Sequence, residues 1–522
     1  MLELTFQLKA LGAFIALVLA GNVLRAKLRS RSRLPLPPGP PGHWLFGNHI
    51  PSANQSQQFA EWINTYGPII SLRLGPSKVM VIIGRHQVND SNTAHRAPSY
   101  SLAKESNDIM EKEGGVLADR PRAVAAGEIL SRGLLIVLAP AGEQLRRLRK
   151  AAHTPLQAKA ADSYAPVQMD AARDVILDIL DNPKGHQAAA NRYAATVMLR
   201  IMYGKSTPTA ANAPDIIVIH KMLKRFQMLM RPGALLIERF PILKYVPGYT
   251  TELEEWRREE SQVYHDKLNR VSREFATGKA GPSFARYLLE NQSSHKLSDD
   301  EMAYLAGSLF GAGSDTTAVA IMYVVMASAC YPKAQEKVQE QLDIVVGRDR
   351  APTFDDYNSL PQIEAFTLEC LRWRPVTTLG FAHRASADIV YKGMLIPEGA
   401  IVFGNHWAIS RDPNVYPNPD QFDPERWLNS EGKIRDDIKF PSFGFGRRIC
   451  PGRHVANRSV FINAALLLWS FKITQDPENP IDQMGFADGV VAHPKPFSAR
   501  FQPRFGDEGS LRNVMTMYGE GL

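Results

Sequence analysis

One cysteine in the last quarter of the chain has neighbours that suit chemistry better than packing. Residues 443–454 read FGFGRRICPGRH, so Cys450 lies among glycines and arginines and not among the apolar residues that bury an inert thiol. Glycine permits tight turns and close backbone approach, and positive charges favour a thiolate. A helix predicted from about residue 452 to 469 would add the positive end of its dipole. The pattern predicts an anionic sulfur that a bound group can approach.

Two kinds of chemistry suit such a cysteine. A nucleophile in covalent catalysis needs a histidine base. His454 is close in sequence, but it falls on the predicted helix, which disfavours this role. A thiolate ligand needs only the glycine-rich loop and the positive charge. Arg448, two residues before Cys450, would then pair with an acid on the bound group.

A second polar set interrupts an apolar helix. Residues 302–330 are nearly all apolar and end before Pro332, yet they contain Ala312-Gly313-Ser314-Asp315-Thr316-Thr317. Glycine costs about 1 kcal/mol inside a helix, so its presence needs a reason. Two explanations stay open: the polar groups serve a function, or a glycine packs closely and the threonines bond to the helix backbone.

A third pattern, Glu-x-x-Arg, places its two charged side chains on one helix face. Glu369 and Arg372 fit it and are followed by the residues WRPV. The pattern alone is weak, because it also occurs at Glu143/Arg146, Glu254/Arg257 and Glu255/Arg258. Its position upstream of Cys450 distinguishes Glu369.

The pattern Phe443-x-x-Gly446-x-Arg448-x-Cys450-x-Gly452 resembles the cytochrome P-450 family of haem-thiolate monooxygenases. The similarity runs from the proline-rich segment near residue 34 to about residue 505. It implies that Cys450 is the axial thiolate to the iron of haem b (heme b). The two motif glycines would let the backbone lie close to the porphyrin and direct N–H groups at the sulfur, which Phe443 would shield from water.

The resemblance also implies roles for residues outside the loop. At Asp315 and Thr316 the helix would widen into an oxygen-binding groove, where the hydroxyl holds dioxygen and the carboxylate relays protons. The pair Glu369–Arg372 would join Arg426, of the segment FDPERW, in a buried charge network that fixes the cysteine loop. The remaining implied residues are bases for the haem propionates: Arg149, His383 and Arg448, with Arg120 as a weaker candidate. Leu145 stands where many relatives have tryptophan, so one propionate hydrogen bond should be missing.

The elements that position these residues read as a mainly α fold with a minor β part, the cytochrome P-450 fold. A hairpin is predicted from residues 69–74 and 79–83, helical texture from 143 to 341, and short strands at 389–391 and 400–403. No linker, repeat or low-complexity tract divides the body. We expect a hinge at 34–42 (LPLPPGPPG), a single domain at 43–505 and a tail at 506–522.

Residues 1–33 predict a membrane anchor. An apolar run at 4–24 precedes five bases, whereas a cleaved signal peptide carries its positive charge before the apolar run. The positive-inside rule then leaves the body in the cytosol, at the endoplasmic reticulum membrane. Three widely spaced cysteines agree with a reducing compartment. The net charge of +8 comes without any nucleic-acid-binding motif, so it favours a membrane or an acidic protein as partner.

The expected activity is insertion of one oxygen atom from O₂ into a lipophilic small molecule. The chain carries no flavin or nicotinamide motif, so electrons from NADPH must arrive through a separate NADPH-cytochrome reductase. A basic face suits such an acidic partner: Arg146, Arg147, Lys150, Arg447, Arg453 and Arg458. Two rivals are a thiolate enzyme that acts on peroxides, which the Asp315–Thr316 pair disfavours, and a haem protein that carries a ligand without turnover.

The substrate is predicted only by class. The segments expected to face it are mostly apolar: the helix around Ser308, Phe310 and Ala312, and residues 134–138, 216–247 and 376–379. Residues 216–247 fit equally a core segment, an entry route or a membrane-dipping loop. The sequence of stretches such as RYAATVMLRIMYGK resembles that of fungal microsomal members that act on secondary metabolites. A terpenoid or polyketide substrate is therefore expected. The alternative is a broad-range xenobiotic-oxidising enzyme.

Overall fold

The computed structural model describes residues 34–75, 78–85, 104–205, 213–231, 235–487, 489–504 and 506–518. The expected anchor, residues 1–33, lies outside the described residues. Within them, α13 is the one helix long and apolar enough to cross a membrane, and 78% of its most apolar window is buried inside the protein.

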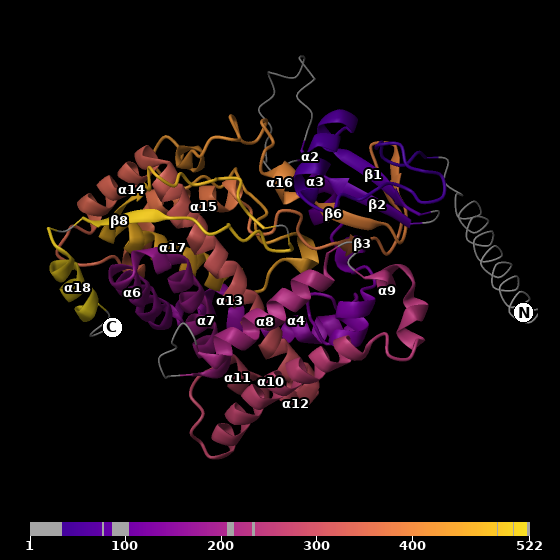
Figure 1. Ribbon diagram of the computed structural model, residues 1–522, viewed down its shortest axis with the longest axis horizontal. Helices are drawn as coiled ribbons and strands as arrows, with labels where there is room; N and C mark the ends of the chain where they lie inside the picture. Colours follow the sequence, from indigo (N-terminus) through magenta and orange to yellow (C-terminus); the bar gives the residue numbers. More distant parts are fainter. Residues whose placement is uncertain are drawn as a thin grey trace, which may run out of the picture.

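Helices make up most of the chain, with a small sheet at one end (Figure 1). The α-helices are α2 Gln55–Tyr66, α3 Lys104–Ser106, α4 Glu143–Leu156, α5 Ala158–Asp162, α6 Ala165–Asp181, α7 His186–Tyr203, α8 Pro214–Leu229, α9 Leu236–Arg239, α10 Thr251–Ala276, α11 Phe284–Glu290, α12 Gln292–His295, α13 Asp299–Cys330, α14 Pro332–Val345, α15 Pro361–Trp373, α16 His406–Ile409, α17 Arg453–Ser470 and α18 Glu508–Met517. The strands are β1 Ile69–Leu74, β2 Lys78–Ile83, β3 His383–Arg384, β4 Ile389–Tyr391, β5 Met394–Ile396, β6 Ile401–Gly404, β7 Phe471–Gln475 and β8 Ala499–Pro503.

The main sheet has the strand order β1-β2-β6-β3. β1 and β2 form the predicted antiparallel hairpin, and β6 joins β2 in parallel, which brings residues near 400 beside residues near 80. The pairs β4–β5 and β7–β8 form two further two-stranded sheets. The sheet positions β3, whose first residue is His383, at the edge of the site.

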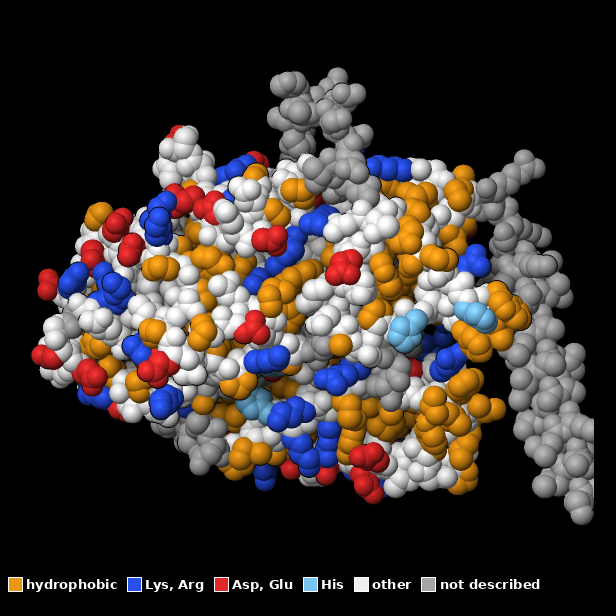
Figure 2. All heavy atoms as spheres, turned by 45° about the horizontal axis from the view of Figure 1, so that its top comes forward, with side chains coloured by type: hydrophobic (Ala, Val, Ile, Leu, Met, Phe, Trp, Pro, Cys, Tyr) orange, Lys and Arg blue, Asp and Glu red, His pale blue; other side chains and the backbone are white. Residues whose placement is uncertain are grey.

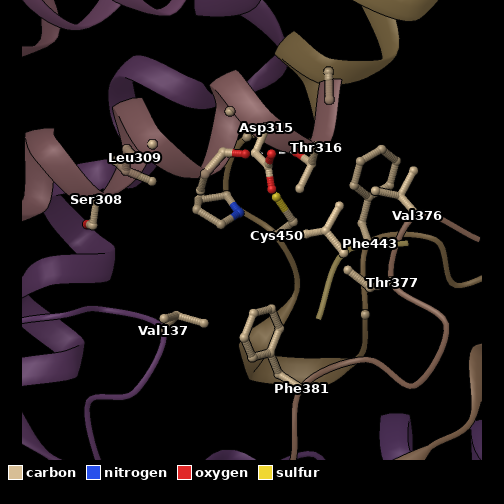
Figure 3. A pocket seen from close by; sticks show the side chains of 18 of the residues that line it. Val137, Ser308, Leu309, Asp315, Thr316, Val376, Thr377, Phe381, Phe443 and Cys450 are labelled. Carbon is tan, nitrogen blue, oxygen red and sulfur yellow. Dashed lines mark hydrogen bonds between the residues drawn. The ribbon is translucent and has the colours of Figure 1, made fainter. Parts of the chain in front are cut away.

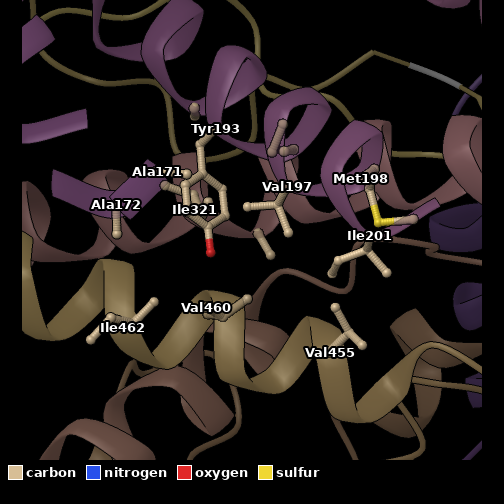
Figure 4. Packing of buried hydrophobic residues seen from close by; sticks show 14 of the residues in the cluster. Ala171, Ala172, Tyr193, Val197, Met198, Ile201, Ile321, Val455, Val460 and Ile462 are labelled. Carbon is tan, nitrogen blue, oxygen red and sulfur yellow. The ribbon is translucent and has the colours of Figure 1, made fainter. Parts of the chain in front are cut away.

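The helical core surrounds α13. A capping box begins this helix: the Ser298 hydroxyl accepts from the Glu301 N–H, and the Glu301 carboxylate accepts from the Ser298 N–H. Buried side chains of α6, α7, α13 and α17 pack together in one cluster (Figure 4). The expected mainly α fold with a minor β part is therefore present in the described residues.

The glycines of α13 permit close helix crossings. A Cβ at Gly307 would lie 2.2 Å from the Tyr264 ring of α10, and one at Gly313 would lie 2.5 Å from the Met198 sulfur of α7. Gly313 is thus a packed glycine, one of the two explanations that the sequence left open.

The expected hinge and the described part of the expected tail both contact the rest of the protein. The proline-rich segment 34–42 lies along the sheet, where Pro38 O accepts from Ser71 N at 2.8 Å and Pro35 O accepts from Leu395 N at 2.8 Å. In the expected tail, α18 buries Leu511 and Met515 in the helical core, and Arg512 pairs with Asp181 of α6. The C-terminal residues up to 518 therefore pack as part of the body.

Candidate functional site

The cysteine loop precedes α17 and closes on itself. Cys450 N donates to Phe443 O at 2.9 Å. Gly444 and Gly446 have positive φ angles of 80° and 51°, which the turn requires. The predicted helix after the cysteine is α17, so the thiol lies at its N-terminal end. The loop presents Cys450 toward a cavity, as Figure 3 shows.

The two motif glycines act differently. The Gly452 N–H interacts with the Cys450 sulfur and lowers the pKa of the thiol. Gly446 is not among the residues that line the cavity. Its Cα faces residues 110–114 instead, with a Cβ position 3.1 Å from both Met110 O and the Gly114 Cα, and its N–H donates to a Glu111 carboxylate oxygen at 2.7 Å. Gly444 and Phe445 line the cavity in its place.

The thiol is less acidic in the protein alone than its sequence neighbours predict. Burial raises the pKa of Cys450, and this effect exceeds the opposing effects of the Gly452 N–H, Arg149 and Arg453. A bound cation would reverse the balance, because metal coordination deprotonates a thiol outright. The loop is therefore suited to a metal ligand and poorly suited to a free nucleophile.

The cavity, about 360 Å³ in volume, brings together residues far apart in sequence. Cys450, Phe443 and Gly452 line it, and so do Asp315 and Thr316 of α13. Its walls include all four bases singled out in the sequence, Arg120, Arg149, His383 and Arg448. The remaining walls are mostly apolar.

Three of these bases, Arg120, Arg149 and Arg448, form a positive cluster in which Arg120 and Arg448 are buried. Arg120 donates to the carbonyls of Ala382 at 2.6 Å and Val137 at 3.0 Å, and Arg448 donates to those of Ala118 and Ala139, both at 2.6 Å. Burial, followed by repulsion from Arg448 and Arg149, lowers the pKa of Arg120 to about 9. Burial and repulsion from Arg149 lower that of Arg448 to about 10.

His383 carries no charge in this environment. Burial, followed by repulsion from Arg120, lowers its pKa to about 3. Its Nδ1 contacts Leu117 O at 2.6 Å and must be the protonated nitrogen, which leaves Nε2 as an acceptor. His383 therefore needs a nearby anion, which would raise its pKa, before it can donate to a propionate.

The residues fit haem b. This group carries an iron and two carboxylates, and the cavity offers one thiol and a cluster of cations whose mutual repulsion a bound anion would relieve. Leu145, for which the resemblance implied a missing propionate hydrogen bond, is buried in the helical core and is not among the residues that line the cavity.

Asp315 and Thr316 face the cavity above Cys450 (Figure 3). The Thr316 hydroxyl donates to Ala312 O at 2.9 Å, so the threonine is back-bonded, and α13 continues through this point as regular α-helix without the expected widening. The Asp315 carboxylate accepts from Gln227 Nε2 of α8 at 3.0 Å and lies 2.7 Å from His493 Nε2. Burial lowers the pKa of His493, but the hydrogen bond to Asp315 and its charge outweigh burial and raise it overall.

Glu369 is the centre of a buried charge network. Its carboxylate pairs with Arg372 through two bonds, at 2.7 Å and 2.8 Å, and accepts from Arg426 Nε at 3.2 Å. It also accepts from Trp427 Nε1 at 2.9 Å, a contact that the sequence did not indicate. Arg372 in turn donates to the carbonyls of Ser410 and Pro419, which joins α15 to the segment before the cysteine loop.

One expected pocket residue points elsewhere. Phe310 is fully buried against Tyr203 of α7 and does not line the cavity, whereas its neighbours Leu309 and Gly311 do. Ser308 and Ala312 line it as expected. Polar residues that the sequence did not single out also face the cavity or its acid, among them Gln227, Glu260 and His493. No local motif marks them.

A buried thiol beneath an acid–hydroxyl pair, ringed by cations, defines the haem-thiolate class of proteins. Comparisons with known proteins agree. The cytochrome P450 family model matches residues 37–501. The chain therefore belongs to the cytochrome P450 family, whose members are haem-thiolate oxidoreductases.

Relatives from fungi are similar over most of the chain. Cytochrome P450 monooxygenase 64 of Postia placenta is 50% identical, over 90% of this chain and 92% of its own. Cytochrome P450 monooxygenase 113 of the same fungus is 48% identical, over 94% and 95%. A zebra fish cytochrome P450 solved with abiraterone shares the fold, with a TM-score of 0.69 and 24% identity over 87% of this chain and all of that one.

Proposed function

We propose that this cytochrome P450 monooxygenase hydroxylates a lipophilic small molecule, a fungal secondary metabolite such as a terpenoid or polyketide. The supporting observation is the cavity, in which apolar walls from α8 and α13 converge with Asp315, Thr316 and Cys450. In the overall reaction, O₂, two electrons and two protons convert a C–H bond to C–OH and release one water. The alternative of a broad-range xenobiotic oxidase has the same site and differs only in selectivity.

When bound, haem would supply oxygen activation, and Cys450 would hold its iron. Arg120, Arg149, Arg448 and a protonated His383 would hold its propionates. Asp315 would relay protons, because its carboxylate faces the cavity and also contacts His493, which is part-exposed. Thr316 would direct these protons once its hydroxyl leaves Ala312 O.

The electrons would come from NADPH through a separate reductase. Of the six bases on the expected docking face, Arg147 is paired with Glu301 and Arg458 with Asp162, and Arg146 pairs with Glu143 at the surface. Lys150 and Arg447 are exposed and make no ion pair within the described residues. These two are therefore the better candidates to contact an acidic partner.

We further propose that the protein is held at the endoplasmic reticulum membrane by residues 1–33 and by an apolar surface. That surface, called here the apolar rim, is defined by exposed residues that follow α9: Phe240, Ile242, Tyr245 and Val246. α9 lies on the same side of the molecule as the β1–β2 hairpin (Figure 1), and the chain enters the described body beside that hairpin, where Gly47 bridges Leu74. Hydrophobic side chains gather on the face shown in Figure 2.

Turnover with a fungal reductase tests the activity. Purified full-length protein, reductase and NADPH are incubated under ¹⁸O₂ with a panel of terpenes, polyketides and fatty acids, and products are analysed by mass spectrometry. We expect one ¹⁸O atom in a product from one lipophilic class. Ligand-dependent Soret shifts without any oxygenated product would instead favour a ligand carrier, and product formed only with peroxide would favour a peroxygenase.

A further inference from the structure

Glu260 is a buried acid in the cavity wall, and one of its carboxyl oxygens has no hydrogen-bond partner among the described residues. It lies on α10, is 5% exposed and lines the same cavity as Cys450. Its Oε1 atom is fully buried without a hydrogen-bond partner. Buried polar groups are nearly always hydrogen-bonded, so this carboxyl group lacks a hydrogen-bond partner that a bound molecule could supply.

The charges nearby are already engaged. Among the described residues, Arg225 of α8 is the one cation that acts on Glu260, but its guanidinium bonds to Glu259 at 2.6 Å and stacks on Trp256. Burial therefore dominates and raises the pKa of Glu260 to about 7. The adjacent Glu259 shows the contrast: it is half-exposed and paired with both Lys221 and Arg225, which lower its pKa.

The position of Glu260 relates it to the acid–hydroxyl pair. Tyr264, one turn further along α10, also lines the cavity and packs on Gly307 of α13. Gly307 precedes Asp315 by two turns, which is about 12 Å along the helix. Ser308 faces the cavity at this same level, at the end of α13 away from Cys450 in Figure 3. Glu260 thus belongs to the part of the cavity between α8, α10 and the first half of α13.

Apolar side chains of α8 line the same cavity as this carboxyl group: Ile219, Met222, Leu223 and Phe226. A polar group among apolar walls fixes the orientation of a ligand that is otherwise lipophilic. A hydroxyl group suits both protonation states of the carboxyl, because it donates to a carboxylate and accepts from a carboxylic acid. An ammonium group would lose its own hydration on entering the cavity, and its attraction to the carboxylate would have to offset that cost.

We propose that Glu260 is a substrate-recognition residue that hydrogen-bonds a hydroxyl group on a lipophilic substrate. This inference rests on the proposed function, because it concerns the same cavity. The proposal implies that the substrate already carries a hydroxyl group before this protein oxidises it. An earlier hydroxylation, hydration or carbonyl reduction must therefore supply that hydroxyl group. The carbon that is oxidised would lie on the order of 10 Å from this hydroxyl, given the spacing of Gly307 and Asp315 along α13.

Soret titration of the full-length holoenzyme tests this assignment with probe pairs that differ by one hydroxyl: dodecanol and dodecane, cedrol and cedrane, androstanol and androstane. In the wild type, we expect the alcohol of the best-fitting scaffold to bind about tenfold more tightly than its parent. Glu260→Leu should remove this advantage and Glu260→Gln should keep part of it. Glu255→Gln, a control on the exposed face of α10, should leave it unchanged.

Two further measurements keep the result decisive. The ligand-free Glu260→Leu protein should unfold at a higher Tm than the wild type, because the unpartnered buried carboxyl is gone. A lower Tm would assign the carboxyl to the fold and overturn the proposal. Three binding results would also overturn the proposal. These are an equal preference for alcohols in the wild type and in Glu260→Leu, no preference for the alcohol in any probe pair, and a Glu260-dependent preference for dodecyltrimethylammonium over dodecane. A carbon monoxide difference spectrum of each variant shows separately whether the thiolate-haem site, and with it the proposed function, is intact.

Discussion

At the scale of single residues, the partners of Asp315 explain how an acid is kept ready beside an apolar cavity. His493 and Gln227 hold the carboxylate in place from two other segments of the chain. The acid therefore keeps a fixed position, and one of its partners can exchange protons near neutral pH. Thr316 alone would have no such connection to solvent.

Removing the acid function should separate electron consumption from product formation. In Asp315→Asn, the amide cannot relay protons, so we expect product formation to fall about 100-fold, in the range typical of a lost general acid. NADPH oxidation should fall less. Product, NADPH and hydrogen peroxide measured together check this, with Asp349→Asn as a surface-acid control; equal losses in all three would contradict it.

The His493–Asp315 pair should give the protein a pH-dependent stability. The pKa of His493 is raised above its usual 6.5, so the contribution of the pair is complete below that value and is lost as pH rises through the higher folded-state pKa. Two further groups of α8 face this pair. Lys224 opposes protonation of His493 by charge repulsion, and His220 competes with His493 for the charge of Asp315. We expect the Tm difference between wild type and His493→Gln to shrink from pH 6 to pH 8.5. A difference that is constant across this range would contradict the assignment.

At the scale of elements, a buried charge network joins α15 to the segment after α16. The exposed fractions of the Glu369 and Arg372 side chains are both 0%. Such a pair adds little over an apolar contact, but losing one partner leaves buried charge uncompensated. The network thus fixes the approach to the cysteine loop and tolerates no partial substitution.

Glu369→Ala should therefore be severe. We expect a loss of about 3–5 kcal/mol in the free energy of unfolding, since Arg372 and Arg426 would both remain buried without a carboxylate. Glu255→Ala tests the same Glu-x-x-Arg pattern on the exposed face of α10, where the loss should stay below about 0.5 kcal/mol. Urea unfolding and haem content per chain measure both variants. Similar stabilities for the two would show that the network does not support the loop.

At the scale of the whole molecule, the apolar rim and the expected anchor predict two attachments to a membrane. A protein that begins at Leu34 should still bind neutral lipid vesicles. The double substitution Ile242→Ser and Tyr245→Ser should weaken that binding at least tenfold, because each side chain would otherwise bury apolar area in lipid. Ile344→Ser, on the exposed side of α14, is the matched control. Co-sedimentation measures all three, and an equal effect of the control would contradict a specific face.

The sequence predicted those parts of the fold and site whose residues lie close together along the chain. The cysteine loop, the Glu369–Arg372 pair and the β1–β2 hairpin each lie within a short stretch, so local patterns indicated them, although Glu369 was distinguished from three similar patterns only by its position upstream of Cys450. His493 and Asp315 are 178 residues apart and Gln227 and Asp315 are 88 apart, so no window of sequence contains their contacts. Phe310 was misplaced for another reason: α13 is buried on nearly all sides, and its hydrophobic pattern therefore does not reveal which face lines the cavity.

The measurement closest to the central claim is the carbon monoxide difference spectrum of the reduced full-length protein, taken for the wild type and for Cys450→Ser. The account predicts the absorption band of thiolate-ligated haem in the wild type and its absence in the variant, with haem content measured in both. A wild type that binds haem without this band, or a variant that keeps it, would show that Cys450 is not the ligand on which the site is built.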